Sequence, residues 1–244
     1  MKIVIRVLLT AAVLLLVFMA YRSVSGDIEF EREATMRDRA VIERLVDIRT
    51  AQVAIRARTG SFTDDLDVLA DFVKNGTVAS IRSYGELTEE QLEAGMTVAR
   101  AMEIINAGNQ QAIQRAGLWD AANNRPQLIR DSIFTPVMEA ITAFHRPGFN
   151  PADLPYVPFS DVATGQRERF ELGVDTLMTA SGPLQVFEAK TYFTTYLSDM
   201  DNRLLQQKIQ RNRDRPGDDD APRRFPGMKV GSLRQVVNNA GNWE

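Results

Sequence analysis

The stretch IEFEREATMRDRAVIERLVDIRTAQVAIRA, residues 28–57, decides the fold of this chain. It contains neither Gly nor Pro and is rich in Glu, Arg and Ala, a composition that predicts a long helix. One stripe along it recurs at spacings of three and four residues: Val41, Leu45, Ile48, Gln52 and Ile55. Ile42, Val46 and Val53 widen this stripe, so we expect it to face a core.

The opposite side of the helix carries both signs of charge: Glu43, Arg44, Asp47 and Arg49. Mixed charges on one helix face are typical of a surface that is exposed to solvent and supported by pairs three or four residues apart. We therefore expect this face to be solvated. A coiled coil that binds a partner helix is the alternative interpretation of the same pattern.

Residues 3–21 precede the helix and contain a single charged residue, Arg6. About 20 apolar residues suffice for a helix to cross a bilayer, and a long cationic side chain near the end of such a segment can reach the headgroups. The sequence therefore predicts a membrane anchor over residues 1–26 and an exported body over residues 27–244. A cleaved secretory signal is the alternative, because a short basic start, an apolar stretch and small residues near Gly26 also describe one.

The charges that flank the apolar segment indicate its orientation. A short basic N-terminus ahead of a first apolar segment is the usual start of an exported chain, and Lys2 and Arg6 fit this pattern, although the arginines that follow nearly balance them. We expect a single-pass protein of the inner membrane with its body in the periplasm. The chain contains no cysteine, which excludes disulfides and anchoring by a lipid on cysteine.

The charge composition argues against one class of partner, nucleic acids. The 244 residues include 29 basic and 32 acidic side chains, for a formal net charge of -3, and the two signs are mixed along the chain. A nucleic-acid-binding protein concentrates basic residues on one surface, so this pattern argues against nucleic acid as a partner. Residues 27–244 are numerous enough to bury a core without disulfides.

The clearest strand signal is the alternating pattern of residues 170–178. A turn at 181–183 and a return at 184–189 complete a hairpin. A hairpin needs a further strand or a covering helix to be stable, and the helix over residues 28–57 is the natural candidate. The expected fold class is therefore α+β: an N-terminal transmembrane helix that continues into a long amphipathic helix, which packs on a small antiparallel sheet, with additional helices.

Shorter signals place the remaining elements. Gly60 should end the long helix, and Thr63 should cap a second helix that runs to Asn75. Residues 127–137 are compatible with either a strand or a short helix. Further expected elements are a strand at 77–84, a helix opened by the capping box Thr88 to Gln91, one or two helices within 97–116, and a helix at 192–211.

Three segments are expected to lack long regular elements. Residues 146–160 hold four prolines among aromatic residues, which is typical of a stiff connector; a peptide-recognition surface is the alternative. Residues 211–226 are charged and contain Pro, which predicts a loop-rich segment. The apolar spacing of residues 230–237 predicts that the last part of the chain folds back onto the body.

Residues 51–66, AQVAIRARTGSFTDDL, contain the expected end of the long helix and the residues that follow it. Together with the apolar segment before them, they resemble the end of the first helix in type IV pilins and type II secretion pseudopilins. The matching positions are Gly60, Phe62, Leu66 and Leu69. The resemblance covers about the first 76 residues. The chain departs from that family in its leader, because the apolar run starts at Ile3, contains no Glu and shows no prepilin-peptidase motif.

The end of the chain carries a second resemblance. Residues 227–233, GMKVGSL, and residues 238–244, NNAGNWE, are similar to an uncharacterised family of membrane-anchored bacterial envelope proteins. That family has no established activity, so the resemblance implies a location in the envelope and no chemistry.

No residue pattern indicates catalysis, a cofactor or a metal. His145 is the only histidine and cysteine is absent, so we expect His145 to lie at a loop or helix end without a catalytic role. Asp64, Asp65 and Asp67 suit a helix N-terminus better than a metal site. Asp218 to Asp220 lack the alternating ligands of a calcium loop. We therefore assign no catalytic, cofactor-binding or metal-binding residues.

These observations predict a non-enzymatic single-pass envelope protein, a structural or assembly component of a pilin-like secretion or surface apparatus. Its expected partners are the lipid bilayer and other envelope proteins or further copies of itself. Two alternatives stay open. One is an exported soluble binding protein with a cleaved signal peptide, and the other is a membrane-tethered hydrolase, whose two carboxylates need no local spacing.

Overall fold

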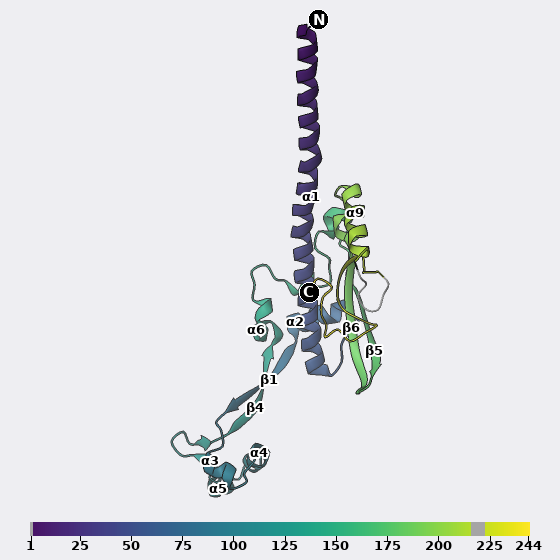
Figure 1. The fold of residues 1–244 in the computed structure, drawn as a ribbon. Coiled ribbons are helices and arrows are strands. Elements are labelled where there is room, and N and C mark those ends of the chain that lie inside the picture. Colours follow the sequence, from purple (N-terminus) through teal and green to yellow (C-terminus); the bar gives the residue numbers. More distant parts are fainter. Residues whose placement is uncertain (1, 216–222) are drawn as a thin grey trace.

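The fold is described from a computed structural model, which places residues 2–215 and 223–244 (Figure 1). Residues 1 and 216–222 fall outside the described part of the chain, so the expectations for Asp218 to Asp220 and for much of the loop-rich segment lie outside it too. The side chains of some residues within helices and strands are also outside the description: 2–5, 7–8, 11, 17–18, 20–25, 80–83 and 130–132.

The first element, α1 (Lys2–Thr59), is one unbroken helix of 58 residues. At 1.5 Å per residue it is about 87 Å long. The helix expected over residues 28–57 lies within it, and Gly60 ends it with a φ of 87°, as the sequence predicted. Figure 1 shows the N-terminal half of α1 extending beyond the rest of the molecule. Within the described residues, no helix has both the length and the apolar character needed to cross a membrane.

A three-stranded antiparallel sheet lies against α1. Its strands are β5 (Glu171–Thr179), β6 (Gly182–Tyr192) and β7 (Gly227–Gly231), in the order β5-β6-β7. The hairpin of β5 and β6 confirms the predicted one. The last part of the chain supplies β7, which confirms the predicted fold-back. Both β6 and β7 contact α1, so the molecule is of the α+β class with a long helix on a small antiparallel sheet.

The other helices of the body are short. They are α2 (Leu66–Asn75), α6 (Val137–Ala140), α7 (Ser160–Thr164), α8 (Phe193–Leu197) and α9 (Asn202–Arg213), with the 3₁₀ turns η1 (Thr142–Phe144) and η2 (Pro151–Asp153). The single helix expected at 192–211 is therefore two helices. The break follows from Asp201, whose carboxylate accepts a hydrogen bond from the backbone N–H of Leu204 at 3.0 Å and starts a new helix.

The core forms along one face of α1. Every member of the predicted stripe is at most 5% exposed: Val41, Leu45, Ile48, Gln52 and Ile55. The largest side chains buried in the same core come from distant parts of the chain: Phe144, Phe187 and Tyr196. Val53 does not widen the stripe, because it lies about 140° around the helix from Ile48 and is 50% exposed.

Gln52 fixes the turn that follows α1. Its side-chain nitrogen donates to the carbonyl oxygen of Thr63 at 2.6 Å, and its side-chain oxygen accepts from the backbone N–H of Thr63 at 3.1 Å. The prediction that Thr63 caps α2 was therefore wrong. Asp65 is the cap, since its carboxylate accepts from the backbone N–H groups of Asp67 and Val68.

Residues 77–136 form an arm that leaves the body (Figure 1). The arm begins as a two-stranded antiparallel ribbon of β1 (Thr77–Tyr84) and β4 (Ile129–Pro136), in which Thr77 lies opposite Pro136 and Tyr84 opposite Ile129. This ribbon confirms the strand expected at 77–84. It also decides the open question at 127–137, which is a strand that leads into α6.

The tip of the arm is a small cluster of its own. Its elements are α3 (Glu89–Glu93), α4 (Val98–Asn106), α5 (Gln110–Arg115), β2 (Trp119–Asp120) and β3 (Arg125–Pro126). The predicted capping box of Thr88 and Gln91 is present at the start of α3. The tip has a separate core made of Ala101, Ile113, Leu118 and Leu128. The one or two helices expected within 97–116 are two, α4 and α5.

Ile48→Asp tests whether the stripe of α1 holds the fold. The side chain of Ile48 is fully buried, so a carboxylate there has no partner and should lower the free energy of unfolding by several kcal/mol. Val53→Asp is the matched control on the same helix, and because Val53 is 50% exposed its cost should stay within about 0.5 kcal/mol. Chemical denaturation followed by circular dichroism measures both. Equal costs would contradict this description of the core.

Candidate functional site

The N-terminal part of α1 presents apolar side chains to the outside. Six described large ones are between 50% and 66% exposed: Leu9, Val13, Leu14, Leu15, Leu16 and Met19. Four of these are consecutive, and four consecutive residues of an α-helix point around almost its whole circumference. Figure 1 shows this segment extending beyond the described elements of the body. A helix that is apolar all round is matched to an apolar environment rather than to water.

Arg37 is the first buried polar contact between α1 and the rest of the body. The residue is 6% exposed, and its guanidinium carbon lies 5.3 Å from the centre of the Phe159 ring. The guanidinium donates to both carboxylate oxygens of Asp199, at 2.6 and 2.9 Å, and to the carbonyl oxygen of Tyr196 at 2.9 Å. Its Nε donates to Glu33 at 2.9 Å. The hydrogen bonds from Arg37 lower the pKa of the Asp199 carboxyl below its ordinary value.

Tyr196 connects this contact to a second one. Its hydroxyl donates to Asp38 of α1 at 2.8 Å, and the ammonium group of Lys208 donates to the other oxygen of Asp38, also at 2.8 Å. Burial, together with the neighbouring Asp38 carboxylate, raises the pKa of the Tyr196 hydroxyl well above its ordinary value. The phenol therefore stays protonated at neutral pH and acts as a hydrogen-bond donor that holds α8 on α1.

Asp47 departs from the expectation of a solvated face on α1. It is 1% exposed, because Arg146 covers it with two hydrogen bonds, one of them 2.8 Å long, and Arg44 lies 3.9 Å away. Arg146 also pairs with Glu43 at 2.6 Å. Burial raises the pKa of the Asp47 carboxyl, the hydrogen bonds from Arg146 oppose that rise, and the hydrogen bond to Asp47 raises the pKa of the Arg146 guanidinium. The expectation for this face was therefore wrong at Asp47.

This ion pair also gives the proline-rich segment 146–160 its position. The ring of Phe149 lies 4.9 Å from the Arg146 guanidinium and stacks on Phe144 at 4.7 Å. Arg44 donates to the carbonyl oxygen of Asp153 in the same segment. The segment is thus held down on α1 by its rings and by two arginines, as a stiff connector would be.

The residues considered for chemistry from the sequence lie apart. His145 is exposed, and its Nε2 lies 2.7 Å from the carbonyl oxygen of Met138. Asp65 caps α2, and Asp67 pairs with Arg169 at 2.9 Å. Among the residues that the structure describes, no three His, Cys, Asp or Glu side chains gather in a group suited to a metal ion.

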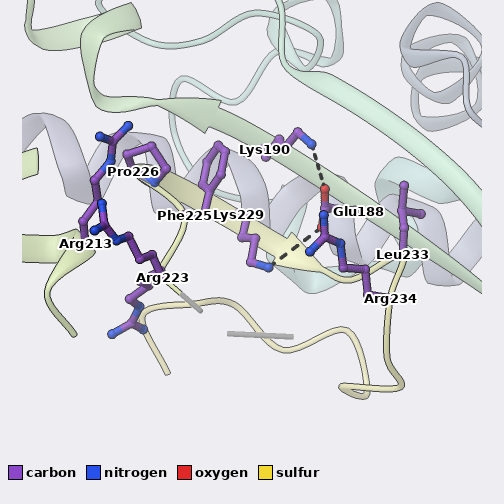
Figure 2. Close-up of a pocket in the computed structure, with 10 residues that line it drawn as sticks. Glu188, Lys190, Arg213, Arg223, Phe225, Pro226, Lys229, Leu233 and Arg234 are labelled. Carbon is purple, nitrogen blue, oxygen red and sulfur yellow. Dashed lines mark hydrogen bonds and ion pairs between the residues drawn. The ribbon is translucent and has the colours of Figure 1, made fainter. Parts of the chain in front are cut away.

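A cavity that the sequence did not reveal lies beside β6 and β7, with a volume of about 520 Å³. We call it the cationic cavity, because six basic side chains line it: Lys190, Arg213, Arg223, Arg224, Lys229 and Arg234. Glu188 is the single acidic residue among its described lining residues. In Figure 2, Arg213 and Arg223 lie at one end of the view and Lys229 and Arg234 at the other, with Phe225 between them.

Strand register explains why the charges gather there. Lys190 of β6 pairs directly with Lys229 of β7, so two cations stand side by side. Glu188 separates them, at 2.9 Å from Lys190 and 3.9 Å from Lys229. Burial disfavours the charge of Lys190, yet its hydrogen bond to Glu188 leaves the pKa of the ammonium group raised. The arginines come from the end of α9 and from the segment on either side of β7.

Arg224, one of the lining residues, is bonded to Asn242 near the end of the chain. Arg224 donates to the carbonyl oxygen of Asn242, and the Asn242 side chain bonds to the backbone of Lys229 and Gly227 at 3.1 and 3.0 Å. The last residues of the chain therefore brace the strand that carries Lys229. The runs Arg211 to Arg215 and Arg223 to Arg224 are the signal in the sequence, but their charges alternate with acidic residues and gave no reason to expect a cavity.

Comparisons with known proteins do not assign the chain. No family model matches it, and neither does any curated protein or solved structure.

The Arg37–Asp199 pair predicts a specific pH dependence. Asp199 has a lowered pKa in the folded protein, so the unfolded chain takes up its proton first, near pH 3.8, and the pair's contribution to stability is present above that pH and lost below it. Asp199→Asn should therefore be less stable than the unchanged protein at pH 7, and the difference should shrink as the pH falls below about 4. Thermal unfolding from pH 7 to pH 3 measures it. A difference that is constant over this range would contradict the assignment.

Proposed function

We propose that this protein is a non-enzymatic, single-pass protein of the bacterial cell envelope. In this proposal the N-terminal part of α1 lies in the inner membrane as a transmembrane helix, and the body and the arm lie in the periplasm. The protein serves as a structural or assembly component, in the manner of the pilin-like apparatus that its first 76 residues resemble, and assembles with other envelope proteins or with itself.

The observation that carries the proposal is the exposure of apolar side chains around the N-terminal part of α1. Val13, Leu14, Leu15 and Leu16 are each at least 50% exposed, and together these four consecutive residues point around almost the whole circumference of the helix. Exposing such a surface to water is costly, whereas a bilayer accepts it. Many side chains of residues 2–25 lie outside the described part of the structure, so the length of the proposed span rests on the sequence, in which residues 3–21 carry Arg6 as their one charged residue.

The continuity of α1 supports an anchored body. The same helix that carries these leucines carries Arg37, Asp47 and Gln52, which are buried and bonded to the rest of the body. One continuous helix thereby links the apolar segment to the core. A non-enzymatic role is supported by the use of ionisable groups as contacts between elements, as in the pairs of Arg37 with Asp199 and Lys208 with Asp38.

Leu15→Arg tests the anchor. An arginine near the centre of a membrane helix costs about 2.5–3.5 kcal/mol of insertion free energy, so the variant should shift from the membrane pellet to the soluble or degraded fraction. Ile28→Arg is the matched control, since Ile28 is 64% exposed on the same helix, Leu15 is 60% exposed, and residue 28 lies beyond the apolar run. Carbonate extraction of membranes followed by immunoblotting measures the shift.

The unchanged protein should stay in the pellet at full length, and protease added outside spheroplasts should digest its body. An intact mass that begins near Gly26, with the protein in the soluble fraction, would contradict the anchor and favour an exported binding protein. Equal extraction of Leu15→Arg and Ile28→Arg would also contradict it.

The arm is the part of the molecule best placed for assembly. It leaves the body as a ribbon of only two strands, and its exposed apolar side chains include Leu92, Val98, Ile133 and Phe134, at 40% to 55%. An isolated two-stranded ribbon is weakly stable by itself and has two unpaired edges, which are typical places for a further chain to bind.

Photo-crosslinking tests this assignment. A photoreactive amino acid at Leu92, in the tip of the arm, should give discrete cross-linked products in intact cells. The same amino acid at Val162 of α7 is the matched control, because Val162 is 58% exposed and Leu92 is 54% exposed. We expect products from the arm position and none from the body position, read by immunoblotting and mass spectrometry. Products from Val162 alone would place assembly on the body instead.

A further inference from the structure

We propose that the tip of the arm, residues 85–128, docks a basic amphipathic helix of another envelope protein. This inference deepens the proposed function and rests on it, because it names the chemistry of the partner that the arm binds. The docking surface lies on α3, α4 and the turn between them, residues 89–105, and the structure describes every side chain in that range.

The small core of the tip is the first argument. Four apolar side chains are buried there, and seven more pack against them while staying partly exposed: Leu87, Met96, Met102, Ile104, Ile105, Ala116 and Trp119. A unit of roughly 40 residues is near the size below which disulfides, a metal or association are usually needed for stability. The chain has no cysteine, and the ribbon that carries the tip has only two strands. Further apolar burial against a partner would therefore stabilise the tip.

The apolar side chains that stay open gather at the turn between α3 and α4. Leu92 is 54% exposed and Val98 is 44% exposed, and Met96 between them is partly buried. The backbone N–H of Met96 donates to the carbonyl oxygen of Gln91 at 2.9 Å, which folds the turn back onto α3. Exposed apolar side chains that adjoin one another within a polar surround mark interaction sites. We call Leu92, Met96 and Val98 the apolar patch of the tip.

The charges around the apolar patch are acidic. Glu89, Glu90 and Glu93 are exposed on α3, and Glu103 is exposed on α4. Among the described residues none of these four carboxylates makes an ion pair, although the body pairs even exposed ones, such as Asp67 with Arg169. The tip as a whole holds six acidic and three basic side chains. Such a surface attracts and orients a partner with positive charge and repels one with negative charge.

An amphipathic helix with basic flanks fits both features. Its apolar stripe is narrow enough for a patch that spans one turn between two short helices, and its lysines or arginines meet the glutamates on either side. Long basic side chains also cover apolar surface with their methylene groups while the charge stays in water. The apolar patch and its acidic surround therefore select the same kind of partner.

A second copy of this chain does not supply that helix. Two tips of equal negative charge repel one another. The basic amphipathic helix of the body is α9, and its apolar face is already buried through Leu204, Leu205 and Ile209. Three of its basic side chains pair with carboxylates of α1: Arg203, Lys208 and Arg211. The occupant of the tip is therefore a helix of a different protein.

Peptide binding to the full chain in a nonionic detergent tests the inference. The chain has no cysteine, so Ala94→Cys, at an exposed position beside the apolar patch, carries one environment-sensitive dye that reports binding at the tip. The probes are two peptides of about 18 residues, roughly five helical turns, with the same leucine face and either lysine or glutamate opposite it. The lysine peptide should bind about tenfold more tightly or better, and added salt should shrink the ratio. Equal affinities would overturn the inference.

Triple variants locate the charges. E89Q/E90Q/E93Q removes three exposed carboxylates from α3, and its affinity for the lysine peptide should fall about tenfold. E29Q/E139Q/E168Q is the matched control, because it removes three exposed glutamates from outside the tip and gives the same net charge. Its affinity should equal that of the unchanged protein. An equal loss in both triple variants would mean that only overall charge matters, which overturns the site.

Double variants test the apolar patch. L92S/V98S should weaken binding of the lysine peptide about tenfold, because it removes the two most exposed apolar side chains of the patch. V162S/M178S is the matched control on the body, where the two side chains are 58% and 81% exposed, and it should bind as the unchanged protein does. A dye response to added unlabelled protein without any peptide would identify a second copy as the occupant and overturn the inference.

Photo-crosslinking from Leu92 in cells separates this inference from the proposed function. Discrete products together with equal affinities for the two peptides would keep the arm as an assembly surface and overturn the basic partner. A preference for the lysine peptide without any product from Leu92 would support the chemistry of the tip and count against assembly through the arm.

Discussion

Burial of one face of α1 is the constraint on which the rest of the structure depends. The apolar stripe centred on Leu45 and Ile48 is covered by elements from both ends of the chain, including β7 and α8. The sheet of β5, β6 and β7 has to bury its apolar side chains, such as Phe187 and Val230, against another layer. The helix supplies that layer, and each element of the body is placed by the part of the stripe that it covers.

Polar groups buried along α1 decide which element lies where. An apolar stripe by itself accepts many positions of a packed segment, whereas a buried charge is costly unless its partner is in place. The buried guanidinium of Arg37 is satisfied only when α8 lies where Asp199 and the carbonyl oxygen of Tyr196 can accept its hydrogen bonds. Asp47 does the same for Arg146 and the proline-rich segment. These contacts add specificity to a core whose stabilisation comes mainly from apolar burial.

Local signals in the sequence were sufficient for the elements and insufficient for the site. Gly60, the capping box at Thr88 and the β5–β6 hairpin each depend on neighbours within a few residues, and all were predicted. Asp47 was misassigned because its partner Arg146 is 99 residues away. The cationic cavity was not predicted for the same reason, because it depends on the strand register that pairs Lys190 with Lys229. Nothing in the local spacing of either lysine indicates that register.

In a continuous helix each residue adds a fixed length of about 1.5 Å, so the order of residues along α1 sets the order of the three parts of the molecule. The apolar segment, the body and the arm follow one another along and beyond α1 (Figure 1). If residues 3–21 lie in a bilayer, Arg49, which pairs with Glu244, is held roughly 42 Å from Tyr21, and the tip of the arm lies beyond the end of α1 at Thr59. A hinge within α1 would remove that spacing. The absence of Gly and Pro from residues 28–57 therefore sets the reach of the body as well as the stability of its core.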